Sequence, residues 1–379
     1  MTRYDDIDAY IKRLIRESTP EATVWNIEKI RQGKKANWNY IDGCMLTALL
    51  EMYRLTGDRE FFDFTDRVAD AFVREDGTVR TYDPEKRSLD DVMEGRILFS
   101  LYEGTQKEKY RRGADYLYRC LMEQPRTFEG SFWHKAIYPN QVWLDGLYMG
   151  QVFSALYQKH FGAGDYSDPV RQVLTVRQRM FDEKAGLYYH GYDASRSAFW
   201  ADPVTGCSKS FWLRALGWFT AALADLYEII PASSERETIG RILRETVSGE
   251  ARYRDAASGM YWQVPNQPGR DGNYLESSGS AMLAYAMMKG ARLGALDADY
   301  AALGRGTFDG IIDRYLTVSD GNLNLGGICL VAGLGPETDR RRDGTYGYYI
   351  SEPVVENDAK GVAPFILCYT EVYSMKGNG

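Results

Sequence analysis

Asp145 lies in residues 142–150, the stretch of this sequence that is richest in groups able to do chemistry. An acid is joined there by two glycines, by the rings of Trp143 and Tyr148, and by a following apolar helical run. Aromatic rings pack against the C–H faces of sugars, and a carboxyl group beside them can donate and accept a proton. The stretch therefore indicates a site that holds a sugar and protonates it, although an Asp at a helix start can also serve only as an N-cap.

Acid catalysis by Asp145 requires that its protonated form be favoured, whereas a helix N-terminus favours the charged form. Removal from water by tryptophan rings and repulsion from a second carboxylate would both oppose the helix dipole. The tryptophans available for this are Trp143, Trp212 and Trp218. Asp90, which opens the preceding apolar helix, is the natural second carboxylate. Asp91 competes with Asp90 for this role, and Asp90 could instead be an N-cap.

A second informative stretch is residues 212–218, in which Arg214 and Trp218 are four residues apart. On a helix this spacing places both side chains on one face. The planar fork of an Arg suits a carboxylate, and a Trp offers a surface for a ring. A uronic acid has both features, so the pair indicates a uronate-binding site. The alternative is an Arg that pairs with a structural Asp.

Other kinds of chemistry find little support in the sequence. Only three histidines are present, His134, His160 and His190, and none belongs to a metal-binding motif. No phosphate-binding glycine loop precedes a strand, and no nucleophile elbow is found. We therefore expect no metal and no cofactor, and we expect carboxylates to do acid–base work on a glycoside, with His134 and His190 in supporting roles.

The elements that must position these residues are mostly helices, since strand signals are sparse. Six segments each open with small, acidic or polar residues and continue as helices that are apolar on nearly all sides: 42–53, 93–102, 145–157, 210–227, 277–288 and 358–373. More amphipathic helices alternate with them, at 58–72, 107–122, 169–180, 233–248 and 300–315. Helices apolar all round must be buried, so repeated pairs predict an inner and an outer ring. With no distinct polar cap at either end, we expect an all-α (α/α)6 barrel that forms one domain over residues 1–379.

The connections before the apolar helices carry unusual residues, among them Tyr40, Asp90, Lys135, His190 and Trp200. If every inner helix enters from the same end, these connections gather at one mouth of the barrel. Loops on a rigid scaffold commonly carry function, so this mouth is the predicted site.

Composition excludes several classes of protein. The 379 residues are 44% hydrophobic and 26% charged, with a net charge of -7, which argues against a nucleic-acid surface. The short basic run Arg340-Arg341-Arg342 is interpreted as a solvated loop. Five scattered cysteines suit a reducing compartment, and the start, residues 1–6, has no apolar signal core. We therefore expect a cytoplasmic protein without a membrane span, for which a monomer is plausible.

These residues together resemble the unsaturated glucuronyl and rhamnogalacturonyl hydrolases of glycoside hydrolase family 105, with family 88 as a more distant relative. The resemblance runs from about Trp38 to the C-terminus, and several motifs in the same order make it more specific than any one of them. The motifs are Leu89-Asp90-Asp91-Val92 with Gly95-Arg96, His134-Lys135, Trp143-Leu144-Asp145-Gly146-Leu147-Tyr148-Met149-Gly150, Trp200-Ala201-Asp202 with Thr205-Gly206-Cys207-Ser208, Phe211-Trp212-Leu213-Arg214 with Gly217-Trp218, Tyr274-Leu275-Glu276-Ser277-Ser278, Arg342-Asp343-Gly344-Thr345, Tyr348-Tyr349-Ile350-Ser351-Glu352-Pro353 and Asn357-Asp358-Ala359-Lys360-Gly361.

The resemblance implies an (α/α)6 barrel that acts on the 4,5-unsaturated uronic acid left by a polysaccharide lyase. It implies that Asp145 is the general acid and base and that Asp90 is its carboxylate partner. Arg214 and Trp218 would hold the uronate. The remaining pocket residues would be Tyr40, His134, Lys135, Trp143, Met149, His190 and Trp212.

The sequence also allows two other interpretations of the function. A second enzyme reading is another (α/α)6 activity, such as a sugar 2-epimerase or an inverting glycosidase. A non-enzymatic helical-repeat scaffold would leave the acids and Arg214 without a purpose. The sequence does not fix the sugar next to the uronate, for which rhamnose from pectin is the family's usual partner. We expect that sugar to contact the loops around Tyr192-Asp193 and in residues 333–344.

Overall fold

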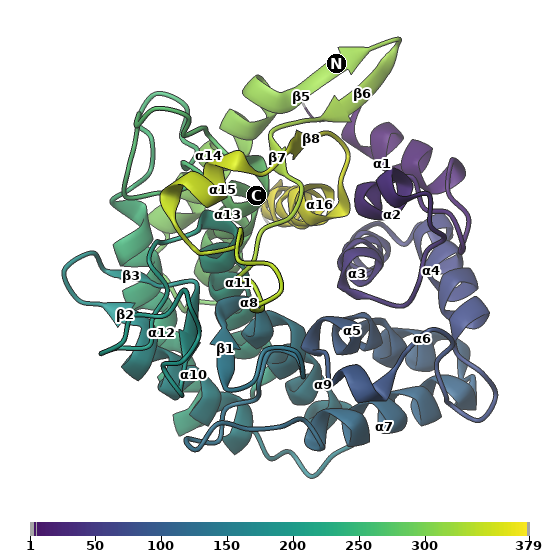
Figure 1. Cartoon of the computed structure of the whole chain (residues 1–379). Coiled ribbons are helices and arrows are strands. Elements are labelled where there is room, and N and C mark those ends of the chain that lie inside the picture. The colour runs from purple at the N-terminus through teal and green to yellow at the C-terminus, as the bar shows by residue number, and fades with distance from the viewer. Residues whose placement is uncertain (1–3, 5, 377–379) are drawn as a thin grey trace.

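Helices arranged in two concentric rings make up most of the molecule, and the computed structural model describes residues 4 and 6–376 (Figure 1). The inner ring consists, in chain order, of α3 (Tyr40–Thr56), α5 (Leu89–Met93) continued by α6 (Ile97–Thr105), α8 (Leu144–Gly146) continued by α9 (Val152–His160), α11 (Leu213–Ile229), α13 (Ser277–Arg292) and α16 (Ala359–Lys376). Each inner helix contacts the next, and α16 contacts α3. The ring is therefore closed, and the expected (α/α)6 barrel is confirmed.

The outer ring follows the amphipathic segments of the sequence. It contains α4 (Arg59–Phe72), α7 (Glu108–Met122), α10 (Ser167–Met180), α12 (Ser234–Ala251) and α14 (Asp299–Tyr315). The sequence pattern did not single out a sixth outer helix. That place is taken by α1 (Ile7–Arg16), which contacts α4, and the short α2 (Ile27–Gln32) follows it. The N-terminal segment thus completes a ring that begins, in the inner layer, only at Tyr40.

Small residues let neighbouring inner helices approach closely. A Cβ on Gly279 of α13 would lie 2.5 Å from the side chain of Leu213, and one on Gly217 of α11 would lie 2.8 Å from Cβ of Met282. Neither glycine could carry a larger side chain without moving its neighbour. The glycines and alanines of the apolar segments are therefore needed for the packing of α11 against α13.

Two inner helices are broken where the sequence suggested continuous ones. Between α5 and α6 lies a 3-10 turn, η2 (Glu94–Arg96), and between α8 and α9 lies a π-helical turn, η3 (Leu147–Gln151). The helical run expected over residues 151–158 agrees with α9, which begins at Val152. π-turns are rare in proteins, but those that occur are often found at functional sites. The extra residue of such a turn changes the direction of the side chains around it.

A repeated backbone hydrogen bond ties the starts of five of the six inner helices to the loop of the following repeat. The backbone N–H of Leu89 donates to the carbonyl of His134, and that of Leu144 donates to the carbonyl of His190 (3.1 Å each). Equivalent bonds of 2.9 to 3.0 Å join Leu213 to Gln263, Ser277 to Gly327 and Ala359 to Trp25. The last of these closes the circle at the mouth, and the first two place a histidine beside each candidate carboxylate.

Short antiparallel strand pairs decorate the loops. They are β1 (Gln141–Trp143) with β4 (Gly191–Asp193), β2 (Phe181–Asp182) with β3 (Leu187–Tyr188), β5 (Leu316–Ser319) with β6 (Asn322–Leu325), and β7 (Ile328–Cys329) with β8 (Val354–Val355). In the first pair Trp143 lies opposite Gly191. This pairing fixes the residues just before Asp145 against those just after His190. A single-turn η1 (Pro84–Lys86) precedes α5, and α15 (Tyr346–Ser351) precedes β8.

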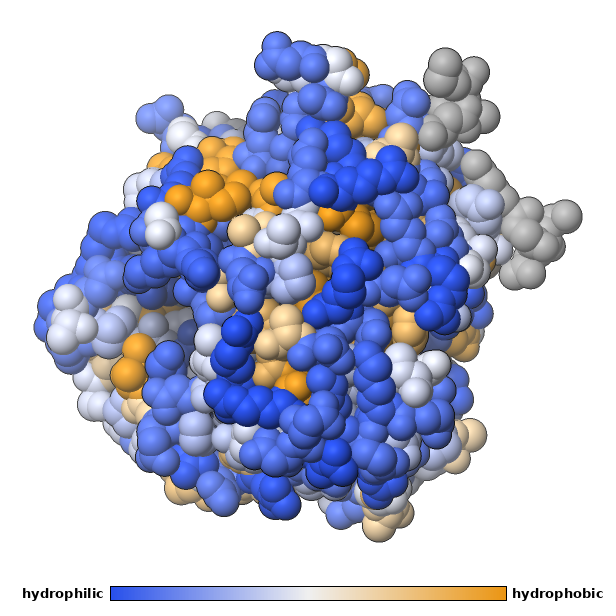
Figure 2. All heavy atoms as spheres, turned by 90° about the vertical axis from the view of Figure 1, so that its right-hand side faces the viewer, coloured by the Kyte–Doolittle hydropathy of each residue, from blue (hydrophilic) through white to orange (hydrophobic). Residues whose placement is uncertain are grey.

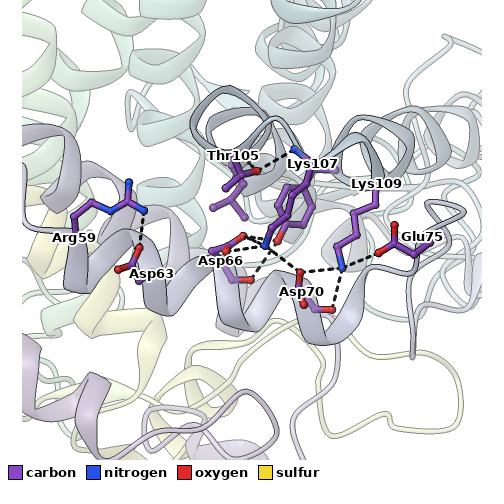
Figure 3. A network of polar contacts seen from close by, with 10 residues as sticks. Arg59, Asp63, Asp66, Asp70, Glu75, Thr105, Lys107 and Lys109 are labelled. Carbon is purple, nitrogen blue, oxygen red and sulfur yellow. Dashed lines mark hydrogen bonds and ion pairs between the residues drawn. The ribbon is translucent and has the colours of Figure 1, made fainter.

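Charged residues hold outer helices together at the surface. Lys107 lies 2.8 Å from Asp66 and 3.1 Å from Asp70, and Lys109 lies 3.0 Å from Asp70 (Figure 3). This network joins α7 to α4 and concerns no residue of the mouth. Figure 2 shows the side on which α1 and α4 lie, where hydrophilic residues cover most of the surface and hydrophobic ones show between them.

The five cysteines are free, and four of them are buried, as expected for thiols. Within residues 4 and 6–376, no helix is both long and apolar enough to cross a lipid bilayer. The expectation drawn from residues 1–6, that a signal core is lacking, falls largely outside the described residues.

Candidate active site

Asp90 is held by two basic side chains in the first turn of α5. Its Oδ2 lies 2.5 Å from Nζ of Lys135, and its Oδ1 lies 3.4 Å from Nε2 of His134. Ser88, and not Asp90, occupies the N-cap position of α5. The interpretation of Asp90 as a helix cap is therefore wrong, and its carboxylate is an ion-paired group of the mouth.

The charge states around Asp90 follow from burial and from this pairing. Burial alone would raise the pKa of Asp90, but the charges of Lys135 and His134 outweigh it and hold this pKa below its usual value. Burial likewise acts to lower the pKa of Lys135, and the Asp90 carboxylate more than reverses this, so that the pKa of Lys135 is raised. For His134 burial prevails and lowers the pKa to about 4. At neutral pH the group therefore comprises an ionised Asp90, a cationic Lys135 and a neutral His134.

Asp145 stands in a different environment, on the second residue of α8. Trp143 occupies the N-cap position of this helix, so Asp145 is not a cap either. Its Oδ2 lies 3.2 Å from Nε2 of His190, but the two atoms are not aligned as a hydrogen bond, and both remain buried without a hydrogen-bond partner. The other ring nitrogen of His190, Nδ1, lies 2.7 Å from the hydroxyl of Tyr349, which orients the imidazole. Oδ2 of Asp145 therefore has no hydrogen-bond partner among the described residues.

The two carboxylates belong to one site. The charges of Asp90, Asp145, Lys135 and His190 all act on the imidazole of His134. A Cβ on Gly146 would lie 3.0 Å from the side chain of Leu89 and 3.3 Å from Nδ1 of His134. A glycine is required at this position because the start of α8 packs directly against the start of α5.

Aromatic rings line one side of the site. Trp143 stacks on the ring of His134 with 4.3 Å between centroids, and it packs against Tyr138 at 4.6 Å. Trp143, Tyr138, Trp200 and Leu334 form a small hydrophobic cluster separate from the main core. This cluster keeps water from one face of His134 and gives the loop of residues 333–344 its anchor at Leu334.

Arg214 opens α11 as expected, but its contacts differ from those suggested by its spacing to Trp218. Its guanidinium lies 4.9 Å from the ring of Trp212, and its Nη1 donates to the carbonyl of Cys329 and, at 3.4 Å, to Oγ of Ser278. The side chain is only 1% exposed. No carboxylate of the described residues pairs with it, so the alternative of an Arg paired to a structural Asp finds no support.

Trp218 and Tyr40 lie near the axis of the barrel. Trp218 packs against Tyr148 at 4.7 Å, and the edge of Tyr40 meets it at 6.4 Å. The charges of Asp90 and Arg214 both act on the hydroxyl of Tyr40, which places that hydroxyl at the same mouth.

Comparisons with known proteins bear directly on this arrangement. A family model described as Glycosyl Hydrolase Family 88 matches residues 10–376. The chain belongs to this family. A solved family 105 glycoside hydrolase from C. acetobutylicum ATCC 824 is 39% identical, with a TM-score of 0.87 over 97% of this chain and 99% of that one. A possible family 105 member from Salmonella enterica is 21% identical, with a TM-score of 0.79 over 99% of this chain and 95% of that one, and it shows the fold alone. Protein Atu3128 of Agrobacterium fabrum is 37% identical over 228 residues, which are 59% of this chain and 97% of that protein.

Within this family 88 glycoside hydrolase, the structure distinguishes the two neighbouring acids that the sequence left as alternatives. Asp91 makes no ion pair among the described residues, whereas Asp90 pairs with Lys135 and also contacts the imidazole of His134. Burial raises the pKa of Asp91 to about 6, the nearby Asp90 adding to this effect. Asp90 is therefore the acid that shares the site with Asp145.

The sequence pattern did not predict two aromatic residues of the glycoside hydrolase site. Tyr349 hydrogen-bonds to His190 and stacks on Trp212 at 5.7 Å with an interplanar angle of 7°. Tyr138 packs on Trp143. Both lie in long connections, and nothing in their spacing showed which tyrosine faces the mouth. Met149, expected in the pocket, lies in the π-turn η3, is 1% exposed and belongs to the main hydrophobic core.

The arrangement supplies the parts of acid–base catalysis. One carboxylate is held ionised by a lysine, and a second has an unbonded oxygen beside a neutral or cationic imidazole. Rings on two sides limit access of water and offer faces for a sugar. The two acids sit in unlike environments, one beside a lysine and the other beside the imidazole of His190.

Proposed function

We propose that this glycoside hydrolase removes a 4,5-unsaturated uronic acid from the non-reducing end of a disaccharide, with Asp145 as general acid and base. The observation that carries the proposal is the unbonded, buried Oδ2 of Asp145 beside His190. A buried carboxyl oxygen without a partner is unfavourable unless a ligand completes it. The water that this carboxylate deprotonates in the proposed reaction would donate a hydrogen bond to it.

The reaction begins at the double bond. The C4=C5 bond of such a sugar is an enol ether, so a proton from Asp145 to C4 leaves positive charge shared by C5 and the ring oxygen. Water deprotonated by the same carboxylate then adds to C5. The resulting hemiketal opens the ring, and the second sugar leaves with its glycosidic oxygen. Because one carboxylate serves both steps, the acid separations of ordinary glycosidases do not apply.

The other residues of the mouth support this chemistry in the proposal. Asp90 stays ionised through Lys135 and His134, and its negative charge favours the proton on Asp145 and the positive charge that develops at C5. Arg214 and Trp218 would bind the uronate, and Tyr40, Trp143 and Trp212 would pack around its ring. Rhamnogalacturonan fragments, with rhamnose as the second sugar, are the substrates we propose to test first.

A family relative supports the substrate class. The unsaturated glucuronyl hydrolase from Bacillus sp. GL1 has the same fold, with a TM-score of 0.64 over 99% of this chain, but only 15% identity. That protein acts in glycosaminoglycan degradation according to its description. The likeness supports an unsaturated uronate as substrate and leaves its neighbouring sugar to experiment.

The test uses disaccharides released by polysaccharide lyases. We expect the ultraviolet absorbance of the unsaturated uronate to fall while the second sugar is released in equal amount. The matched control is the saturated disaccharide of the same linkage, which has no enol ether and should remain intact. Cleavage of the saturated compound would instead indicate an ordinary glycosidase, and a changed sugar without cleavage would indicate an epimerase.

A further inference from the structure

The run Arg340-Arg341-Arg342 contains one arginine that differs from its neighbours. Arg340 pairs with Glu337 at 2.7 Å and lies over the ring of Phe199, and Arg341 pairs with Glu352 at 2.8 Å. Arg342 forms no ion pair with any carboxylate of the described residues. The expectation of a solvated loop therefore holds for Arg340 and Arg341, which are exposed, and not for Arg342, which is partly buried.

The loop turns the side chain of Arg342 toward the site. Gly335 N–H donates to the carbonyl of Arg342 at 2.8 Å, which folds residues 335–342 back on themselves. A Cβ on Gly333 would overlap the guanidinium of Arg342 and would lie 3.3 Å from the ring of Trp143. The guanidinium and the indole thus meet across Gly333. In Figure 1 the segment that leads into α15 passes over the centre of the ring, near α8 and α11.

The charge of Arg342 acts on the catalytic mouth. It is one of the groups that lower the pKa of Asp90, after Lys135 and His134. Its own surroundings are the hydroxyls of Tyr348 and Tyr138, with Asp339 as the nearest acidic influence. The hydroxyl of Tyr348 is itself fixed by the N–H of Gly333 at 3.0 Å. Arg342 is therefore positioned by polar groups, and its charge remains unmatched.

Of the other two cations of the mouth, one is paired with a carboxylate, and the other, which the proposed function assigns to the uronate, is deeply buried. Lys135 pairs with Asp90, and Arg214 is 1% exposed and donates to the carbonyl of Cys329. A guanidinium presents a planar fork that binds a carboxylate through two parallel hydrogen bonds. An unpaired, partly buried arginine beside sugar-binding rings has the geometry to do so.

We propose that Arg342 binds a carboxylate of the substrate and so helps to determine which disaccharides are accepted. This inference rests on the proposed function. The carboxylate belongs either to the unsaturated sugar itself or to an acidic second sugar, and both present the same group to the same fork.

The test compares two unsaturated disaccharides, one with a neutral second sugar and one with a uronic acid in that place. In the variant Arg342→Met the KM should rise about 10- to 100-fold, as loss of hydrogen bonds between charged groups predicts, while kcat changes less than about 3-fold. A rise for both substrates assigns Arg342 to the unsaturated sugar's carboxylate, and a rise only for the acidic one assigns it to the second sugar. Arg342→Lys keeps the charge but loses the fork and should give an intermediate KM.

Two further variants control this experiment. Gly333→Ala should raise the KM in the same pattern, because its methyl group displaces the guanidinium. Arg340→Met removes a neighbouring cation whose exposed partner is Glu337, and it should leave the KM unchanged. Unchanged KM values for both substrates in folded Arg342→Met and Arg342→Lys would overturn the assignment, as would an equal rise in Arg340→Met. Failure of the wild-type protein to consume either substrate would instead overturn the proposed function.

Discussion

Asp90 and Asp145 are two acids of the same type that occupy equivalent places in successive repeats and yet have different surroundings. Each follows a leucine whose N–H binds the carbonyl of a histidine in the next loop. Asp90 also meets Lys135, whereas Asp145 meets only the imidazole of His190. The two surroundings thus differ by one lysine, which pairs with Asp90 and has no counterpart beside Asp145 among the described residues.

Replacing Asp145 by Asn tests its role most directly. The amide is nearly isosteric, keeps the packing of α8 and cannot carry the proton to C4. We expect kcat to fall by about 10²- to 10⁴-fold, while the unsaturated disaccharide still binds because Arg214 and the rings remain. Absorbance assays give kcat, and calorimetry gives the affinity. A folded variant that consumes the enol ether at near the wild-type rate would show that Asp145 is not the acid.

The neighbouring pair Asp90 and Asp91 allows a matched comparison. Asp90→Asn removes the charge that pairs with Lys135 and should lower kcat strongly. Asp91→Asn, one residue away and outside the ion pair, should keep at least about a third of the wild-type kcat, since it touches no reacting group. Equal losses in the two variants would contradict the assignment of Asp90.

Asp91 also predicts a dependence of stability on pH. Its pKa is raised by burial to about 6, compared with about 3.9 in an unfolded chain. The unfolded chain therefore releases this proton first, and the group destabilises the fold as the pH rises from about 4 through 6. The free energy of unfolding of the wild-type protein should fall over this window relative to Asp91→Asn, as measured by urea titrations at several pH values. Parallel curves for the two proteins would contradict the buried state of Asp91.

At the scale of the elements, the opposite ends of the inner helices are held by a buried charge cluster. Asp225 of α11 accepts hydrogen bonds of 2.7 Å from Arg96, Tyr285 and Lys289, which come from η2 and α13. These residues line a cavity of about 120 Å³. The cluster therefore joins three inner-ring segments at the end away from the candidate active site.

The variant Asp225→Asn tests how much this charge cluster contributes to the stability of the inner ring. It leaves Arg96 and Lys289 buried without their common partner, and we expect a loss of about 3–5 kcal/mol in the free energy of unfolding. Burial opposes ionisation of Asp225, but Lys289 and Arg96 lower its pKa to about 2. Its contribution is thus complete above about pH 4 and is lost as the pH falls toward 2, so the difference between variant and wild type should shrink there.

A surface ion pair gives the control for Asp225. Arg59 and Asp63 lie 2.7 Å apart on α4 with both side chains about half exposed (Figure 3). Asp63→Asn should change the free energy of unfolding by less than about 1 kcal/mol, since exposed pairs contribute little. Similar losses in the free energy of unfolding for Asp63→Asn and Asp225→Asn would show that the buried cluster contributes no more to stability than an exposed ion pair.

At the scale of the whole molecule, the barrel brings acids, imidazoles and cations to one mouth without gathering a metal site. Among residues 4 and 6–376, no group of three or more His, Cys, Asp or Glu side chains could hold a metal ion. We therefore expect full activity after exhaustive treatment with a chelator. The measurement is the rate of absorbance loss before and after dialysis against EDTA. A loss that only a divalent ion restores would contradict a metal-free mechanism.

The sequence by itself determined the ring of helices and the place of its chemistry along the chain. Apolar periodicity is a local property, so the inner and outer helices could be predicted from the spacing of side chains. The acids and tryptophans at the helix starts are also local features, and Asp90, Asp145 and Arg214 were predicted for that reason. The 3-10 turn before α6 and the π-turn before α9 were not predicted, because the apolar pattern of the sequence does not distinguish such turns from α-helix.

Only the tertiary structure decided which side chains meet. Asp90 contacts Lys135 and His134, which lie some forty residues later in the sequence. Asp145 lies beside His190, whose ring is hydrogen-bonded to Tyr349, 159 residues further on. Neither Asp145 nor Asp90 is a helix cap, although both stand where caps are common. These contacts form because the ring closes through the packing of α16 on α3, which brings loops far apart in the sequence to one end of the barrel. The charged groups of the site therefore meet only in the closed ring, because the members of each pair come from different segments of the chain.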